Sequence, residues 1–158
     1  MDHIDKILKQ WQLQKPELDC SAIAIIGRIE RANQLIEKNI IPTFQKYELS
    51  NIEFDILATM RRNPTPLTPT ELYRSLMLSS GAVSTRIEKL VKRGLIKRQY
   101  NEEDRRSCNV ILTDAGIELI DSAFNEHINN EKRLLTPLTE IEQTQLAALL
   151  KKYLLANE

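Results

Sequence analysis

Residues 95–112, LIKRQYNEEDRRSCNVIL, have the pattern of a β-hairpin with a charged tip. Two strand-like runs, residues 95–100 and 107–112, flank a polar segment that contains Asp104, Arg105 and Arg106. Two adjacent guanidinium groups at a hairpin tip suit contact with a DNA backbone or a narrow minor groove. The carboxylate of Asp104 can hold one of them in a fixed orientation through a bidentate ion pair. We therefore expect a hairpin that presents paired arginines to a duplex.

Two short helices are expected directly before this hairpin. Thr68 to Glu71 fits a capping box with proline at the first helical position, which predicts a helix from Glu71 to Met77. A turn of three or four residues separates it from a second helix, about Ser79 to Arg93, and Gly94 then suits the positive φ that often ends a helix. Helix, tight turn and helix followed by a hairpin predict a winged helix-turn-helix.

The second of these helices is the expected recognition helix. Val83, Ile87 and Leu90 share one face and should pack inward. The opposite face is small and hydrogen-bonding at its N-terminal end, and its residues are Ser79, Ser80, Ser84, Thr85, Arg86 and Lys89. Small residues let a helix approach the major groove closely, and a helix N-terminus favours phosphate. An ordinary solvated face would have a similar number of cations, but would not usually concentrate Ser, Thr and Gly at one end before a hairpin.

The rest of the chain is predicted to be helical. We expect a long first helix that starts at Leu18 and ends near Pro42 to Tyr47. A second should run from Ile52 to Arg62, after a capping box at Ser50. Thr113 can cap a fifth helix, and Thr139 begins the capping box of a last one. The fold class is thus mainly α with a small β-hairpin wing.

The terminal helices extend beyond the winged helix-turn-helix core. One domain, residues 1–158, would contain this core at 48–112 and apolar-faced helices at 18–47 and 113–156. An exposed apolar stripe usually finds a partner, and a second copy of the chain is the economical one. The predicted assembly is a homodimer. The alternative is that these helices fold back on their own core.

The net charge does not indicate a nucleic-acid-binding protein, but the distribution of charge along the chain does. The net charge is zero over 158 residues, yet residues 61–106 hold eleven cationic and five anionic side chains. The chain shows no apolar run of membrane-spanning length and no signal-peptide pattern, so we expect a cytoplasmic protein without a membrane partner. Two cysteines and two histidines at distant positions predict no metal site, and no enzyme or cofactor motif is present.

The chain resembles the multiple-antibiotic-resistance regulator (MarR) family of bacterial transcription factors. The resemblance covers nearly the whole chain and is most specific at residues 93–98 (RGLIKR), 104–107 (DRRS) and 112–116 (LTDAG). It implies a homodimeric repressor with interlocked terminal helices, bound to a palindromic operator through recognition helices in successive major grooves. It further implies minor-groove contact by Arg105 or Arg106, an orienting role for Asp104, and Arg98 at the base of the wing.

Part of the chain resembles the MarR subgroup that responds to urate or small aromatic acids. In that subgroup a Trp before the first helix, an Asp in the second and a wing Arg contribute to the response, and Trp11, Asp55 and Arg105 or Arg106 occupy comparable places. Arg28 and Lys46 are the further expected partners of a ligand carboxylate. Urate sensors also carry an Arg shortly before the second helix, where this chain has Lys46. The alternative for Trp11 is a hydrophobic clasp on a partner subunit.

Two other hypotheses remain at this stage. Cys20 falls at the predicted start of the first helix, where the helix N-terminus would lower the thiol pKa and permit oxidant sensing. The alternative for Cys20 is a small buried side chain.

A winged helix can also serve protein assembly without binding DNA, since a fold does not fix a function.

Overall fold

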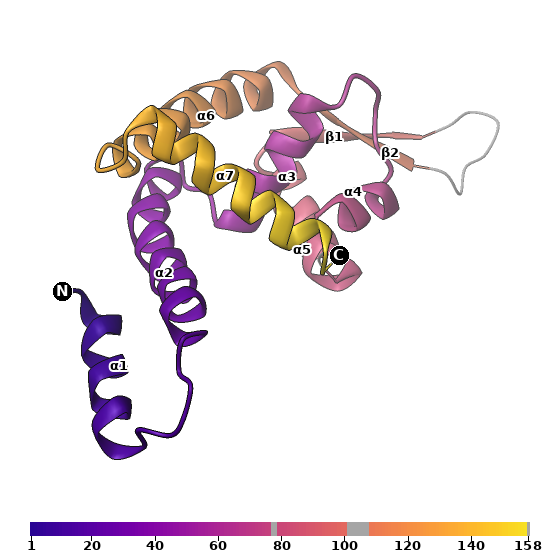
Figure 1. The fold of residues 1–158 in the computed structure, drawn as a ribbon. Helices are drawn as coiled ribbons and strands as arrows, with labels where there is room; N and C mark the ends of the chain where they lie inside the picture. Colours follow the sequence, from indigo (N-terminus) through magenta and orange to yellow (C-terminus); the bar gives the residue numbers. More distant parts are fainter. Residues whose placement is uncertain (77–78, 101–107, 158) are drawn as a thin grey trace. The chain divides into compact units, whose positions relative to one another are not determined.

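The structure is a computed structural model that describes residues 1–76, 79–100 and 108–157 (Figure 1). Its elements are α1 (His3–Gln14), α2 (Ile23–Lys46), α3 (Asn51–Arg62), α4 (Pro69–Ser75), α5 (Ser80–Lys92), β1 (Ile96–Tyr100), β2 (Cys108–Leu112), α6 (Asp114–Leu134) and α7 (Glu140–Leu155). The predicted fold class, mainly α with a small hairpin, is confirmed. Two compact units divide the chain at Ile40 and Ile41, and each is described by itself. Over the described ranges, no helix is long and apolar enough to cross a membrane.

The first unit contains a helix that the sequence analysis did not predict. Asp2 caps α1 in a reciprocal capping box with Asp5. Ile4 is buried, and Gly27 in α2 provides the space for it, because a Cβ at that glycine would lie 3.0 Å from the Ile4 Cδ1 atom. Trp11 lies within α1, before the helix that was predicted as the first one.

The start of α2 also differs from the prediction. The helix begins at Ile23 rather than Leu18, because the residues from Cys20 to Ile23 form a turn before it. In that turn the Ser21 N–H donates to the Asp19 carboxylate at 2.9 Å and the Ile23 N–H donates to the Cys20 carbonyl at 3.0 Å. The helix continues through Pro42 to Lys46, within the predicted range for its end.

The second unit is organised around α3, α5 and the hairpin. Its fully buried side chains come from each of these elements and from α4 and α6, and they include Ile56, Leu57, Leu72, Ile87, Leu90, Ile96, Val110 and Ile120. The predicted capping boxes at Ser50, Thr68 and Thr139 are all present. These caps fix where α3, α4 and α7 begin.

The hairpin has the expected topology. β1 and β2 lie side by side and pair antiparallel, from Ile96 opposite Leu112 to Tyr100 opposite Cys108 (Figure 1). Before the hairpin, Gly94 ends the α5 segment with a φ of 72°, as predicted. After it, Thr113 caps α6, also as predicted.

Candidate nucleic-acid interface

The exposed N-terminal half of α5 is the centre of the candidate interface. Ser79 is the N-cap, and its side chain accepts from the Ala82 N–H at 3.4 Å. Ser79, Ser80, Ser84 and Thr85 are exposed, as predicted, while Val83, Ile87 and Leu90 on the other face are buried. No heavy atom of the described residues lies within 4 Å of a Cβ built on Gly81, so this end of the helix is open to an approaching surface.

Arg86 and Lys89, the two predicted cations of the recognition face, have different environments. Arg86 is half-buried and takes part in no ion pair with the described residues. The Lys89 Nζ lies 2.9 Å from the Oε1 atom of Glu53, whose side chain is fully buried. Lys89 is exposed, as predicted, and its ammonium group also forms an ion pair with the start of α3. Contact of Lys89 with the major groove stays a prediction. The capping box predicted Glu53 as a helix cap, but no local signal pairs it with Lys89.

The base of the wing is held to α5. The Arg98 guanidinium in β1 forms an ion pair with Glu88 of α5 and lies 3.8 Å from the Cys108 Sγ atom in β2. Hydrogen bonds to Cys108 and to Glu88 raise the pKa of Arg98. Arg98 thus joins both strands to the recognition helix, at the wing base where it was expected. Asp104, Arg105 and Arg106 lie outside the described residues.

The predicted ligand residues are divided between the two units. In the first unit Trp11 is exposed, and the Arg28 guanidinium is 2.8 Å from Asp2 and 2.6 Å from Asp5. In the second unit the Lys46 Nζ is 2.7 Å from Glu126. Arg28 and Lys46 are therefore already neutralised by carboxylates of their own unit.

Asp55 is an exposed residue of α3, the helix that forms one side of a small pocket not predicted from the sequence, and it is not among the lining residues. The pocket, about 160 Å³ in volume, lies between α3 and α6 and is lined by Ala58, Arg61, Arg62, Ile120, Asp121 and Phe124. Loss of water around its carboxyl group raises the pKa of Asp55, against the opposing charges of Arg62 and His127. Arg61 forms a bidentate ion pair with Asp121, in which the Arg61 Nε is 2.7 Å from the Asp121 Oδ1. Among the described residues, Arg62 is therefore the cation of this pocket that is not already in an ion pair.

Cys20 lies outside the first turn of α2, where a helix N-terminus would lower the pKa of a thiol. The thiol is free and half-buried, but the residue precedes α2, in the turn described above, and does not occupy its first turn. Oxidant sensing by Cys20 therefore remains a prediction from the sequence pattern alone.

Comparison with known proteins agrees with this geometry. Residues 47–107 match the family model of the MarR family. Over 159 aligned residues the chain is 38% identical to the HTH-type transcriptional regulator PecS of Dickeya dadantii (strain 3937), with 98% of this chain and 96% of PecS covered.

Solved structures of one relative superpose on most of the chain. The apo form of wild-type MarR from E. coli matches with a TM-score of 0.69 and 27% identity, covering 82% of this chain and 96% of MarR. A cysteine-to-serine mutant of MarR from E. coli, complexed with operator DNA, matches with a TM-score of 0.73 and 26% identity, covering 87% and 99%. With its winged helix-turn-helix, and with PecS matched almost from end to end, the chain belongs to the MarR family of transcriptional regulators.

Proposed function

We propose that the chain is a repressor that binds duplex operator DNA as a homodimer, with α5 as its recognition helix. The observation that carries the proposal is the exposed hydroxyl-bearing face at the N-terminal end of α5, formed by Ser79, Ser80, Ser84 and Thr85. Its small side chains and capped N-terminus suit close approach to base edges and phosphates. The E. coli MarR mutant with the same fold is bound to operator DNA. This favours DNA binding over a purely protein-assembly role.

The wing completes the proposed contact. Arg98 and Glu88 tie the hairpin to α5, so the hairpin is held beside the recognition helix. We assign the flanking minor-groove contact to Arg105 or Arg106, and the orientation of that guanidinium to Asp104, on the basis of the sequence pattern. Since the relatives that support the proposal are bacterial regulators of transcription, we place its action in the cytoplasm.

Dimerisation is supported by the terminal helices. Every residue of α7 is described, and none of them is buried. The side chains of Ile141, Leu149 and Leu155 are 71%, 67% and 72% exposed. An exposed apolar surface of this extent on one helix usually packs against a partner. In a two-fold dimer, the same helix of the second copy can bury it.

Binding to DNA selected from a random pool, followed by fluorescence anisotropy at several salt concentrations, tests the proposal. If a dimer neutralises roughly eight phosphates, log K should fall against log salt with a slope of about −7. Tight binding by a monomer, or affinity that does not depend on salt, would contradict the proposal.

A response to a small aromatic acid is the second candidate function. The pocket between α3 and α6 combines apolar walls at Ala58, Ile120 and Phe124 with the available cation of Arg62, a combination that suits one ring with one carboxylate. We keep Asp55 of α3 as a proposed ligand residue. Trp11, Arg28 and Lys46 remain proposals from the sequence pattern.

The ligand proposal is tested by calorimetric titration of salicylate, hydroxycinnamate and urate with and without operator DNA. An allosteric ligand must bind free protein more tightly than DNA-bound protein, by the same factor by which it weakens DNA binding. Arg62→Gln should abolish this binding, whereas Lys97→Gln, at an exposed cation of the wing, should leave it unchanged. Equal affinities in the two titrations would exclude the allosteric role.

A further inference from the structure

One buried carboxylate joins two helices of the second unit. The Glu53 Oε2 accepts hydrogen bonds from the Ser50 N–H at 2.8 Å and the Ser50 hydroxyl at 2.9 Å, which caps α3. Its Oε1 is 2.9 Å from the Lys89 Nζ of α5. Burial raises the pKa of Glu53, but the bonds from Ser50 and Lys89 outweigh it, so the pKa lies below the ordinary value and the group is ionised at neutral pH.

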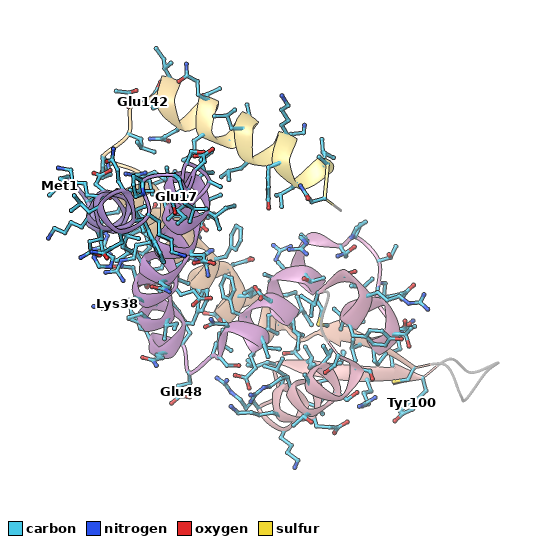
Figure 2. All side chains as sticks on the ribbon, turned by 60° about the horizontal axis from the view of Figure 1, so that its bottom comes forward. Met1, Glu17, Lys38, Glu48, Tyr100 and Glu142 are labelled. Carbon is cyan, nitrogen blue, oxygen red and sulfur yellow. The ribbon has the colours of Figure 1, made fainter. Side chains whose placement is uncertain are left out.

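A second cation of α5 binds the turn that leads into α3. The Arg93 Nη1 donates to the Glu48 carbonyl at 2.7 Å, and its Nη2 donates to the Tyr47 carbonyl at 3.3 Å. Glu48 lies where the chain passes from α2 to α3 (Figure 2). Its φ is 54°, in the left-handed region that non-glycine residues rarely adopt. Arg93 therefore stabilises a turn whose backbone is unfavourable by itself.

From these contacts we infer that Lys89 and Arg93 are positioning residues for DNA recognition, which fix the recognition helix to the α2–α3 turn and do not touch DNA. This inference rests on the proposed function. Both side chains reach from the C-terminal half of α5 and its C-cap to the start of α3 and the turn before it. Together they join α5 to the residues from Tyr47 to Glu53.

The free-energy cost of breaking the Lys89–Glu53 ion pair explains why Lys89 would not contact a DNA phosphate. Moving Lys89 to a phosphate would leave Glu53, with a fully buried side chain, as an unpaired charge, which is strongly unfavourable. Holding α5 in one orientation has a direct use, because a recognition surface that shifts by about 1 Å loses the geometry of its contacts. The ion pair therefore affects which sequence is bound, and leaves phosphate affinity to other cations.

Glu53→Gln distinguishes a positioning role from a purely electrostatic one, because the two roles predict opposite changes in operator affinity. Glutamine at this position can keep the capping box with Ser50 but removes the charge that holds Lys89. Electrostatics alone predicts tighter binding to any DNA, since a negative charge is lost. Positioning predicts that operator affinity falls by roughly ten-fold, comparable to the loss of one base contact, while affinity for scrambled DNA does not fall.

Lys89→Gln and its matched control Lys92→Gln complete the binding experiment. Lys92 is an exposed lysine of the same helix, so the two substitutions remove the same charge. Lys89→Gln should lower the ratio of operator to scrambled affinity without changing the salt slope, and Lys92→Gln should leave the ratio unchanged. If Lys89 contacts phosphate, its loss should instead reduce the slope by about 1.8 for a dimer, with little change in the ratio, and the inference is wrong.

Hydrogen exchange of the free protein provides a measurement that does not depend on DNA. Amides of residues 80–92 should exchange faster in Glu53→Gln and Lys89→Gln than in the wild type, while those of residues 114–134 stay protected. Equal protection of α5 in all three proteins would overturn the inference. If the wild type bound no duplex, the proposed function would fail, and the exchange comparison would still establish whether these side chains hold α5.

Discussion

At the scale of the residue, Gly116 is where the backbone of α6 meets the backbone of the wing. A Cβ at this position would lie 2.0 Å from the Leu95 carbonyl oxygen and 3.0 Å from the Leu95 carbonyl carbon. The same corner is closed by Thr113, whose hydroxyl donates to the Gly94 carbonyl at 2.7 Å. Only glycine fits here, because backbone atoms cannot move aside as a side chain can.

Gly116→Ala should therefore destabilise the fold by roughly 1–3 kcal/mol, the usual cost of overpacking a rigid site. Gly81→Ala is the matched control: its new methyl group meets no described atom, and alanine in the first turn of α5 should stabilise by at most about 0.5–1 kcal/mol. Urea unfolding at fixed protein concentration measures both. A Gly116→Ala protein as stable as the wild type would contradict the packing of α6 on the wing.

Glu53 should contribute a pH-dependent part of the stability. Its pKa in the folded chain lies below the ordinary value of 4.5. A carboxylate with a depressed pKa stabilises the fold above its unfolded pKa, and that contribution is lost as the pH falls through the folded pKa. The difference in unfolding free energy between wild type and Glu53→Gln should therefore be constant from neutral pH to about pH 5 and shrink below it.

Urea unfolding between neutral and acid pH measures this difference. Glu142→Gln is the control, because Glu142 makes the same capping box with Thr139 but has no cation within ion-pair distance among the described residues. Its pH-dependent contribution should be smaller. If the difference in unfolding free energy between wild type and Glu53→Gln increased on acidification, the assigned direction of the pKa shift would be wrong.

At the scale of the element, local signals in the sequence predicted most of the helix starts and ends. The capping boxes at Ser50, Thr68 and Thr139 and the positive φ at Gly94 depend on residues close together in the chain. Helix α1 was missed although it has such a signal, since Ile4, Ile7, Leu8 and Trp11 follow helical spacing after the Asp2 cap. Its box uses Asp5, an aspartate, at the position where glutamate is usual.

The contacts that could not be predicted join distant segments. Lys89 and Glu53 lie on different helices, and the pattern of α5 alone assigned Lys89 to its solvent face. The pocket beside Arg62 depends in the same way on how α6 packs against α3. Periodicity identifies which side of a helix is polar, but it does not identify the partner of each polar group.

The N-cap of α5 offers a test in which stability and DNA binding respond differently. Ser79→Ala removes the bond to the Ala82 N–H and should cost about 1 kcal/mol. Ser79→Asp keeps a capping oxygen and should preserve stability, but it places a carboxylate on the proposed recognition face and should weaken operator binding. Thr139→Asp makes the corresponding exchange at the N-cap of α7 and should leave operator binding unchanged.

Thermal unfolding and anisotropy titration measure the two effects of the Ser79 variants. Full operator affinity in a stable Ser79→Asp protein would show that this end of α5 does not meet DNA.

At the scale of the whole molecule, the exposed apolar surface of α7 is the feature that a single chain does not explain. Leu149 and Tyr153 are 67% and 51% exposed, and they lie one turn apart on the same helix. A monomer would present these side chains to water, whereas a dimer of the proposed kind would cover them. The state of assembly then determines DNA affinity, because two linked recognition helices bind two half-sites at a high effective concentration.

Leu149→Arg should therefore convert the protein to a monomer, because a guanidinium without a partner is strongly disfavoured in an apolar interface. Thr144→Arg adds the same charge to the same helix at an exposed polar position away from the Leu149 face, and should leave the dimer intact. Light scattering measures the mass, and anisotropy measures the operator affinity at several salt concentrations. A monomer contacts half as many phosphates, so its salt slope should fall from about −7 to about −3.5. A Leu149→Arg protein that remains dimeric would show that this side chain lies outside the interface, and one that is monomeric but keeps the full slope would separate DNA binding from dimerisation.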